Sequence, residues 1–311
     1  MEGLNWTSRK EFVLLGFSEY PKTEMFIFLL CLAMYMVIIL GNTIIIILTI
    51  LDCHIHIPMY FFLSNLSFLD ICFTSSFVPK MLTNFSSGRK TISFSGCVIQ
   101  MYIFLAVGST ESVLLATMAY DRYMAICNPL RYPTIMNKRH CVQLVVTSWL
   151  VGFLNSAMET ALATRLPFCG KNTINHFFCE ILAILKLACV DISLNEIVML
   201  IDSITLAFSP LLLIIISYIF ILSAILRINS AEGRKKAFST CSAHLTVVTV
   251  FYGTVFFMYM KPKSKNSITD KFITLFYSVV TPMLNSIIHS LRNKEVNAAM
   301  RNVLKRLPFK R

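Results

Sequence analysis

Charged residues are scarce in this chain of 311 residues. They make up 14% of the sequence, against roughly 25% in soluble domains. Glycine and proline contribute only 10 residues each, which excludes collagen-like and low-complexity sequence. Hydrophobic residues make up 56% of the chain, and its 25 phenylalanines exclude an intrinsically disordered protein. The composition indicates a protein whose surface contacts a lipid bilayer rather than water.

The motifs of common enzyme and metal sites are also missing. The chain contains no HExxH, no glycine-rich phosphate loop and no nucleophile elbow, and its cysteines lack the close pairs of zinc sites. The net charge of +12 would suggest nucleic acid in a soluble protein, but not in one with this composition. We therefore expect neither an enzyme nor a nucleic-acid-binding protein.

Uninterrupted apolar segments follow one another along the chain, and each is long enough to cross a bilayer as a helix. The segments are 25–50, 58–82, 97–120, 141–164, 196–226, 237–260 and 271–291. A hydrocarbon core of about 30 Å needs about 20 helical residues, whereas barrel strands have about 10 residues that alternate in polarity. The sequence predicts an all-α membrane protein, a seven-transmembrane helix bundle over residues 25–291. Pro79, Pro210 and Pro282 fall inside these segments and are expected to kink them.

The two ends of the chain are polar. Residues 1–24 lack the apolar core and small-residue cleavage site of a signal peptide, so we expect them to remain as an N-terminal tail. Residues 292–311 combine basic residues with apolar residues at helical spacing. This pattern predicts a short amphipathic helix and tail lying on anionic membrane lipid. An unstructured basic tail is the alternative.

Two glycosylation triplets indicate the orientation, because basic loop residues hardly distinguish the two sides. One triplet begins at Asn5 in the N-terminal tail, and the other begins at Asn84 in what we expect to be a loop on the same side. We expect an extracellular N-terminus glycosylated at Asn5, a cytoplasmic C-terminus and a multi-pass protein of the plasma membrane. Most of the positive charge then faces the cytoplasm.

Several of the 10 cysteines gather on the expected extracellular side. Cys97 begins the third segment, and Cys169, Cys179 and Cys189 lie in the loop between the fourth and fifth segments. That compartment is oxidising, and four thiols allow three pairings, between which the sequence does not choose. A bridge from Cys97 to the loop would hold the loop over the mouth of the bundle. The remaining cysteines are expected to be small buried hydrophobes.

Acidic residues inside the predicted spans are costly and therefore mark functional sites by default. They are Asp70, Glu111, Glu159 and Asp202. Asp70 and Glu111 lie near mid-span, at the depth of Asn285, so they could share a proton or hold a sodium ion. A structural polar network without an ion is the alternative for this pair. For Glu159 the alternative is that it faces a headgroup region.

The third segment ends in MAYDRYMAIC, residues 118–127. In this segment Asp121 and Arg122 are adjacent at a helix end, where they can hold each other in one conformation and separate in another. With this motif the chain resembles rhodopsin-like G-protein-coupled receptors, and among them the tetrapod-type vertebrate olfactory receptors. The resemblance extends over nearly the full length. It also includes GN at 41–42, PMYFFL at 58–63, LSFLD at 66–70, SY at 217–218, KAFSTCSAHL at 236–245, PMLN at 282–285 and SLRN at 290–293.

The resemblance implies an odorant receptor that binds small volatile molecules in the outer half of the bundle. It would activate a stimulatory or olfactory G protein to raise cAMP, and it would need no cofactor beyond a sodium ion, if Asp70 and Glu111 hold one. The implied ligand-binding residues are Phe104, Leu105, Gly108, Ser109, Ser112, Asp202, Ser203, Leu206, Tyr252, Val255, Phe256 and Tyr259. The implied residues of the coupling switch are Asp121, Arg122, Tyr123, Tyr218 and Asn285. For the cysteines the resemblance favours Cys97 with Cys179, which leaves Cys169 and Cys189 as a second pair.

The chain departs from the family pattern after Asn285. The family has proline next and tyrosine three residues later, where this chain has Ser286 and His289. Loss of the proline is expected to straighten the last span, and loss of the tyrosine removes a hydroxyl that moves on activation. A poorly coupling, pseudogene-like odorant receptor is therefore one alternative. A non-olfactory rhodopsin-like receptor, which shares the fold, is another. A transporter or channel with acids on a conduction path is a third alternative, against which the lack of repeat symmetry and the motif around Asp121 and Arg122 argue.

Overall fold

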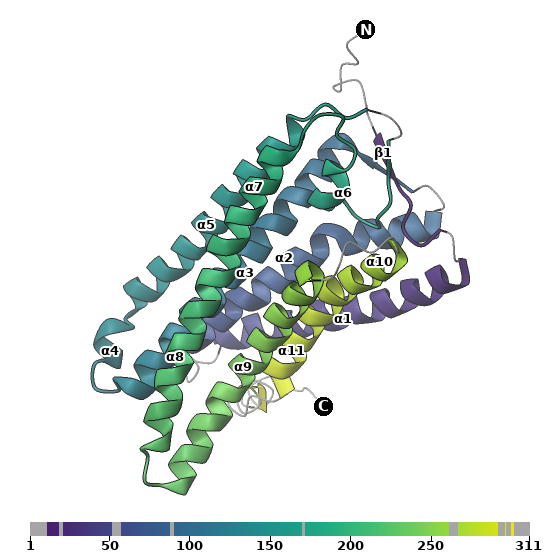
Figure 1. Ribbon diagram of the computed structural model, residues 1–311. Coiled ribbons are helices and arrows are strands. Elements are labelled where there is room, and N and C mark those ends of the chain that lie inside the picture. The colour runs from purple at the N-terminus through teal and green to yellow at the C-terminus, as the bar shows by residue number, and fades with distance from the viewer. Residues whose placement is uncertain are drawn as a thin grey trace, which may run out of the picture.

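The computed structural model describes residues 11–18, 21–51, 57–87, 90–169, 172–260 and 267–291, together with 296, 300 and 301. Figure 1 shows long helices packed side by side into a bundle, with a small sheet near one end. We call this the sheet end, and the other the opposite end. Asn5, most of the predicted C-terminal helix and the side chains of Tyr259 and His289 lie outside the described residues.

Seven helices are long and apolar enough to cross a membrane, which confirms the predicted bundle. Two of the crossings are built from two α-helices joined by a π-helical turn, η3 or η4. The elements of the crossings are α1 (Pro21–Leu51), α2 (Pro58–Ser87), α3 (Phe94–Cys127), α5 (Lys138–Thr164), α7 (Ser193–Asp202), η3 (Ser203–Phe208), α8 (Ser209–Leu226), α9 (Ala231–Met260), α10 (Ser267–Leu275), η4 (Phe276–Val280) and α11 (Thr281–Leu291). The short helix α4 (Tyr132–Ile135) connects α3 to α5.

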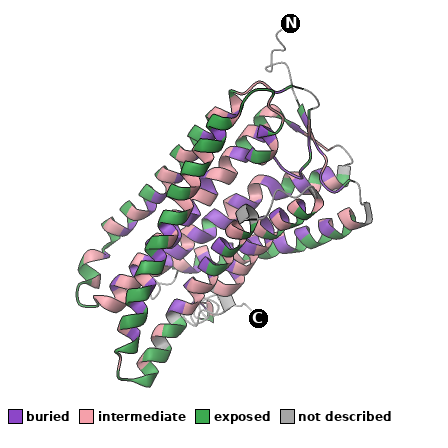
Figure 2. Ribbon diagram, in the orientation of Figure 1, coloured by how far each residue is buried: buried purple, intermediate pink, exposed green. Residues whose placement is uncertain are grey.

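Helix α3 lies at the centre of the bundle and packs against α2, α5, α8 and α9. Buried residues line the inner faces of the helices, whereas much of the outer surface is exposed (Figure 2). Large apolar side chains such as Met25, Leu212 and Phe220 are among the exposed ones. In water such a surface would be unfavourable, whereas lipid tails accept it.

Two of the prolines inside the spans follow π-helical turns. Pro210 is the second residue of α8, directly after η3, and Pro282 is the second residue of α11, directly after η4. A proline lacks the N–H that would bond the carbonyl four residues earlier, so the helix must adjust there. The expected kinks take the form of these wider turns. Helix α11 itself runs without interruption through Ser286.

The sheet end carries three short strands that the sequence analysis did not predict. They are β1 (Glu11–Leu14), β2 (Thr91–Ser93) and β3 (Thr173–Ile174), in the order β2-β1-β3. β1 is antiparallel to β2 and parallel to β3. Residues 11–14 are thus the central strand of a sheet, although they were expected to be part of a polar tail.

The residues that follow β1 contact α10, the first helix of the seventh crossing. Gly16 has a φ of 52°, in the left-handed region that favours glycine. Its carbonyl accepts a hydrogen bond from the Lys271 ammonium of α10 at 2.6 Å. The Phe17 ring packs against the rings of Phe177 and Phe272, with centroids 6.0 and 5.1 Å away.

The structure contradicts one expectation used for the orientation. Asn84 does not lie in a loop, because α2 continues to Ser87. Its side chain is only 4% exposed and faces the protein interior. A glycosylation acceptor must be accessible at the surface, so the triplet at Asn84 cannot serve as evidence of orientation.

The closest crossing of α3 with α5 depends on Gly152. A Cβ at this position would lie 2.5 Å from the Ala106 carbonyl oxygen and would collide with the Thr110 side chain. Nearby, Ser156 Oγ donates to the Tyr102 carbonyl at 2.6 Å, which fixes the same crossing. The backbones of the two helices are therefore as close as glycine allows.

We predict that Gly152→Ala destabilises the protein by about 1–3 kcal/mol, because the added methyl group forces α5 away from α3. Gly253→Ala is the matched control, since a Cβ there has no neighbour within 4 Å. It should leave stability unchanged or raise it by up to about 1 kcal/mol through helix propensity. Thermal unfolding of both variants in lipid nanodiscs measures the difference, and equal melting temperatures would contradict the proposed crossing.

Candidate functional site

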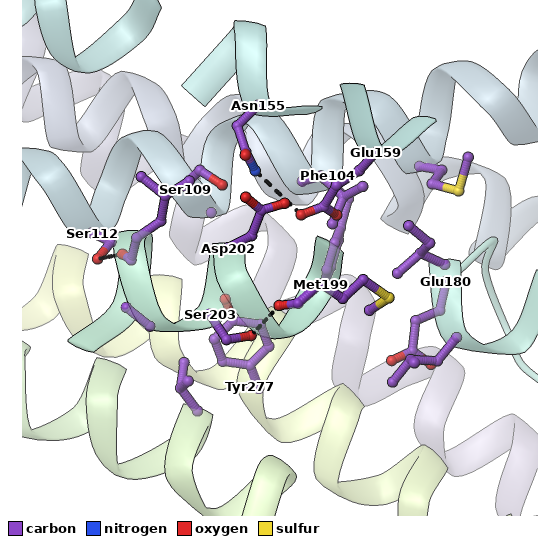
Figure 3. Close-up of a pocket in the computed structure, with 18 of the residues that line it drawn as sticks. Phe104, Ser109, Ser112, Asn155, Glu159, Glu180, Met199, Asp202, Ser203 and Tyr277 are labelled. Carbon is purple, nitrogen blue, oxygen red and sulfur yellow. Dashed lines mark hydrogen bonds between the residues drawn. The ribbon is translucent and has the colours of Figure 1, made fainter. Parts of the chain in front are cut away.

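A cavity of about 170 Å³ lies inside the bundle near the sheet end. Figure 3 shows side chains from several helices converging on it. Helices α3, α5, α7 and α9, the turns η3 and η4, and the loop with α6 (Ile181–Leu185) contribute its wall. The volume lies below the roughly 300–1,000 Å³ of pockets for drug-sized ligands, so the cavity fits a small molecule.

Most residues that the sequence analysis expected at a ligand site line this cavity. They are Phe104, Leu105, Gly108, Ser109 and Ser112 of α3, Asp202 of α7, Ser203 and Leu206 of η3, and Val255 of α9. Their spacing explains why the expected residues of α3 and η3 line the cavity, because residues three or four apart share a helix face. The structure therefore brings these side chains together around one space.

Two expected residues of α9 do not line the cavity. Phe251 and Val255 face it instead, which places Tyr252 and Phe256 one position further around the helix. Phe256 packs against Phe208, with the ring centroids 5.5 Å apart. Tyr252 is buried behind the cavity wall.

Ser112 connects three elements around the cavity. Its hydroxyl donates to the Leu206 carbonyl at 2.5 Å and also forms a 2.8 Å hydrogen bond with the Tyr252 hydroxyl. Leu206 lies four residues before Pro210, so no backbone N–H at residue 210 is present to bond its carbonyl. A residue of the cavity wall thus satisfies a carbonyl in η3 and contacts α9 at the same point.

Several residues of the cavity wall were missed by the sequence analysis. They are Met101, Asn155, Glu180, Ile181, Leu182, Met199, Ala207, Phe251 and Tyr277, together with Glu159 and Cys179, which were noticed but not placed there. Asn155 Nδ2 donates to Glu159 Oε1 at 3.2 Å, across one turn of α5. The spacing of these two polar residues could have indicated a polar face on α5. Glu159 faces the cavity and not a headgroup region.

Two disulfides place the loop that covers the cavity. Cys97 is bonded to Cys179, and Cys169 to Cys189, with Cα atoms 5.4 and 5.5 Å apart. The backbone N–H of Cys179 also donates to Gln100 Oε1 at 2.8 Å. The loop residues that follow Cys179 are thereby held against α3, over the cavity.

Glu180 in this loop has an unusual environment. Its side chain is only 18% exposed, and its Oε2 lies 3.7 Å from His176 Nε2. Burial raises the pKa of Glu180 to about 7; Lys186 lowers it and Asp270 raises it. Burial, with Lys271 and Lys186 nearby, lowers the pKa of His176 to about 3. His176 is therefore neutral near pH 7, and its contact with Glu180 is not an ion pair.

A second polar cluster lies at mid-bundle. Asp70 of α2, Glu111 of α3 and Asn285 of α11 are all buried there. Asn285 Nδ2 donates to Asp70 Oδ1 at 3.4 Å, and its side chain also reaches Glu111. Among the residues that the structure describes, Asp70 Oδ2, Glu111 Oε1 and Asn285 Oδ1 have no hydrogen-bond partner. The structure thus brings together the two acids that the sequence paired.

The expected switch residues other than Asn285 lie toward the opposite end. Asp121 Oδ1 accepts a 2.8 Å hydrogen bond from the Tyr132 hydroxyl, and no ion pair joins Asp121 to Arg122 in the described part of the chain. The Tyr123 ring lies 6.0 Å from that of Phe220. The Asp121 side chain is thus held by α4 and not by its neighbour.

Helices α8 and α9 are joined to α3 through one histidine. The Tyr218 hydroxyl forms a 2.8 Å hydrogen bond with His244 Nδ1, and His244 Nε2 lies 3.1 Å from the Leu115 carbonyl oxygen. The opposite ring nitrogens of His244 therefore connect α8 and α3 through α9. A movement of α9 away from α3 would have to break this connection.

A family model described as olfactory receptor matches residues 30–306. The chain belongs to the olfactory receptor family. Olfactory receptor 13D1 of Homo sapiens is 61% identical over 98% of this chain and 89% of its own length. Olfactory receptor 13C9 of Homo sapiens is 57% identical over 99% of both chains, and human olfactory receptor 13F1 is 59% identical over 98% of this chain and 96% of its own. As a member of this family the chain is a multi-pass membrane receptor for odorants and not an enzyme.

We predict that Glu180 lowers the stability of this olfactory receptor as the pH rises from about 5 to 8, whereas His176, with its lowered pKa, acts in the opposite direction below pH 6.5. Between about pH 5 and 8 folded Glu180, with its pKa raised to about 7, binds a proton that the unfolded chain has released. Glu180→Gln should remove this contribution and stabilise the protein at pH 8 by up to about 3 kcal/mol. Melting temperatures of the purified receptor across this pH range measure the effect. Glu196→Gln, on the exposed face of α7, is the control that should keep the native pH dependence; an unchanged slope in Glu180→Gln would contradict the assignment.

Proposed function

We propose that this receptor binds small volatile odorants in the cavity near the sheet end and activates a G protein of the stimulatory or olfactory type, which raises cAMP. The observation that carries the proposal is the cavity inside the bundle, with its mostly apolar wall. Small-molecule sites are typically apolar spaces with a few polar groups that orient the ligand. The hydroxyl and carboxyl groups of Ser109, Ser203 and Asp202 supply such groups here.

The hydrogen bonds of Ser112 connect the cavity to α9, so they support an effect of odorant binding on the position of this helix. An odorant that displaces Ser112 or Leu206 changes the contact of Ser112 with Tyr252. A ligand shifts a conformational equilibrium only by its difference in affinity for the two states. We propose that odorant binding favours a state in which α9 moves away from α3.

At the opposite end, this movement would open a space beside Arg122 for the G protein. The Tyr218–His244 hydrogen bond and the contact of His244 with Leu115 would have to rearrange. Asp121 would remain on Tyr132, while Tyr123 and Asn285 take part in the change. Ser286 packs against Gly41 of α1 and bonds the Met283 carbonyl, so this helix is held firmly where the family has proline.

The disulfides support an orientation with the sheet end outside the cell. Disulfides persist in the oxidising extracellular compartment, and both bridges lie at the sheet end, one of them joining α3 to the loop. We propose an extracellular N-terminus with glycosylation at Asn5. The basic segment 292–311 would then lie on the anionic lipid of the cytoplasmic leaflet.

Filling the cavity tests the proposed odorant site. A Cβ on Gly108 would have only the Tyr277 hydroxyl within 4 Å, at 3.8 Å, so a leucine there would extend into the cavity. We predict that Gly108→Leu raises the odorant concentration for half-maximal response at least tenfold. The measurement is a cAMP reporter in cells with olfactory chaperones and a panel of alcohols, aldehydes, ketones, esters, thiols, acids and amines.

Gly253→Leu is the matched control, because it makes the same substitution on a helix surface without neighbours. It should respond like the native receptor at equal surface expression. An unchanged response of Gly108→Leu would contradict the location of the site. Silence of the native receptor to the whole panel at good surface expression would contradict the proposed function itself.

We further propose that Asp70, Glu111 and Asn285 hold a sodium ion. Their buried and unpartnered oxygens are hard ligands of the kind that such cations prefer. A bound cation supplies the positive charge that two neighbouring buried carboxyl groups lack. The cluster thus fits the ion in chemistry and in location between α2, α3 and α11.

We predict that replacing sodium by N-methylglucamine at constant ionic strength changes the half-maximal odorant concentration of the native receptor at least threefold. Asp70→Asn should abolish this dependence, because it removes a charged ligand. Glu196→Gln, on the exposed face of α7, is the control that should retain it. A native receptor indifferent to sodium would contradict the ion site.

A further inference from the structure

The charged side chains of the cavity wall are all acidic. Glu159, Glu180 and Asp202 line the cavity, whereas no lysine, arginine or histidine belongs to its described wall. A cavity whose charged groups are all carboxyl groups attracts a cation and repels an anion, and the low dielectric of the surrounding protein strengthens both effects. The charge of the wall therefore discriminates between ligands.

Glu159 and Asp202 form a contact across the cavity wall. Figure 3 shows their carboxyl groups directed toward each other, with Asn155 beside them. The two carboxyl groups are within hydrogen-bonding reach, although they come from different helices, α5 and α7. Glu159 is only 6% exposed. Two carboxyl groups this close repel each other when both are ionised, and a cation beside them removes that repulsion.

The pair lacks hydrogen-bond donors. Asn155 Nδ2 is the described donor to this pair, and it bonds Glu159 Oε1 at 3.2 Å. Apart from the neighbouring Glu159 carboxyl group, buried Asp202 Oδ2 has no hydrogen-bond partner among the described residues. A buried carboxyl oxygen without a donor is costly. A ligand that brings donors into the cavity would relieve this cost.

A protonated amine matches these needs better than other ligand chemistries do. An ammonium group carries a positive charge and up to three N–H donors, whereas an alcohol offers one donor and no charge. A bare metal ion would leave the apolar part of the wall without a partner, whereas an alkylammonium ion carries an apolar chain as well as its charge. The apolar side chains of Phe104, Leu206 and Val255 on the same wall can hold an alkyl chain.

We infer that this cavity selects small aliphatic amines, whose ammonium group binds between Glu159 and Asp202 while the alkyl chain contacts the apolar wall. The inference rests on the proposed function for the location of the ligand, and it adds the ligand's chemical class. Asp202 and Glu159 act as specificity-determining residues, and Glu180 adds a further carboxyl group at the loop.

A matched series of ligands tests the inference by binding alone. The full-length receptor in lipid nanodiscs is melted with hexylamine, hexan-1-ol, hexanoic acid and N,N,N-trimethylhexylammonium, and apparent dissociation constants are taken from the shifts of melting temperature. We expect hexylamine to bind at least tenfold more tightly than hexan-1-ol, and hexanoic acid to bind more weakly than both. The trimethyl compound keeps the charge without N–H donors, so it should bind less tightly than hexylamine.

Two variants that keep nearly the same side-chain shape measure how much the two carboxyl groups contribute to binding, apart from the rest of the cavity. Glu159→Gln and Asp202→Asn should each weaken hexylamine binding at least tenfold and bring it close to that of hexan-1-ol. Glu196→Gln removes a negative charge from the exposed face of α7, and it should keep the native preference. If a variant does not fold, the preference of the native receptor among the four ligands tests the inference on its own.

Equal binding of hexylamine and hexan-1-ol, or no binding of hexylamine, would overturn the inference. So would a preference for hexylamine that survives in both variants. The cAMP assay distinguishes these outcomes from a failure of the proposed function. Responses to other odorants without amine binding would overturn the inference alone, whereas amine binding without any cAMP response would support the inference and contradict the proposed coupling.

Discussion

The structure depends on one constraint, which is that backbone groups inside a bilayer must find their partners within the protein. Pro210 leaves the Leu206 carbonyl without its helical partner, and the hydroxyl of Ser112 takes that place. Ser112 lies on α3, the helix that contacts most of the bundle, and it also bonds Tyr252 on α9. A requirement of the backbone thus creates a junction of three elements at the wall of the cavity.

The lack of water inside the bilayer also explains why polar side chains gather in two places. Asp70, Glu111 and Asn285 satisfy one another in part at mid-bundle, and Glu159, Asn155 and Asp202 do so beside the cavity. In both clusters some buried oxygens have no donor among the described residues. Such groups are expensive in a low dielectric, so each cluster marks a point where an additional positive charge would be stabilising.

Much of the architecture could be predicted, because the apolar segments are long and the helical period places Gly108, Ser109 and Ser112 on one face. The helical period was less informative on α9, because it did not decide whether Phe251 or Phe256 faces the cavity. The strand β1 has only four residues, and its partners lie about 80 and 160 positions away, so no local pattern indicates it. Asn84 looked like a loop residue because polar residues surround it, although α2 continues past it.

The pairing of β1 has a consequence for the order of assembly. β1 obtains one neighbour from the loop after α2, another from the loop after α5, and a final fastening from Lys271, which is 255 residues later in the chain. During synthesis the amides of Leu14, Leu15 and Gly16 can find their partners once residues 90, 174 and 176 exist, whereas the Gly16 carbonyl must wait for Lys271. The N-terminal segment is therefore fully fixed in place only when the seventh crossing is present.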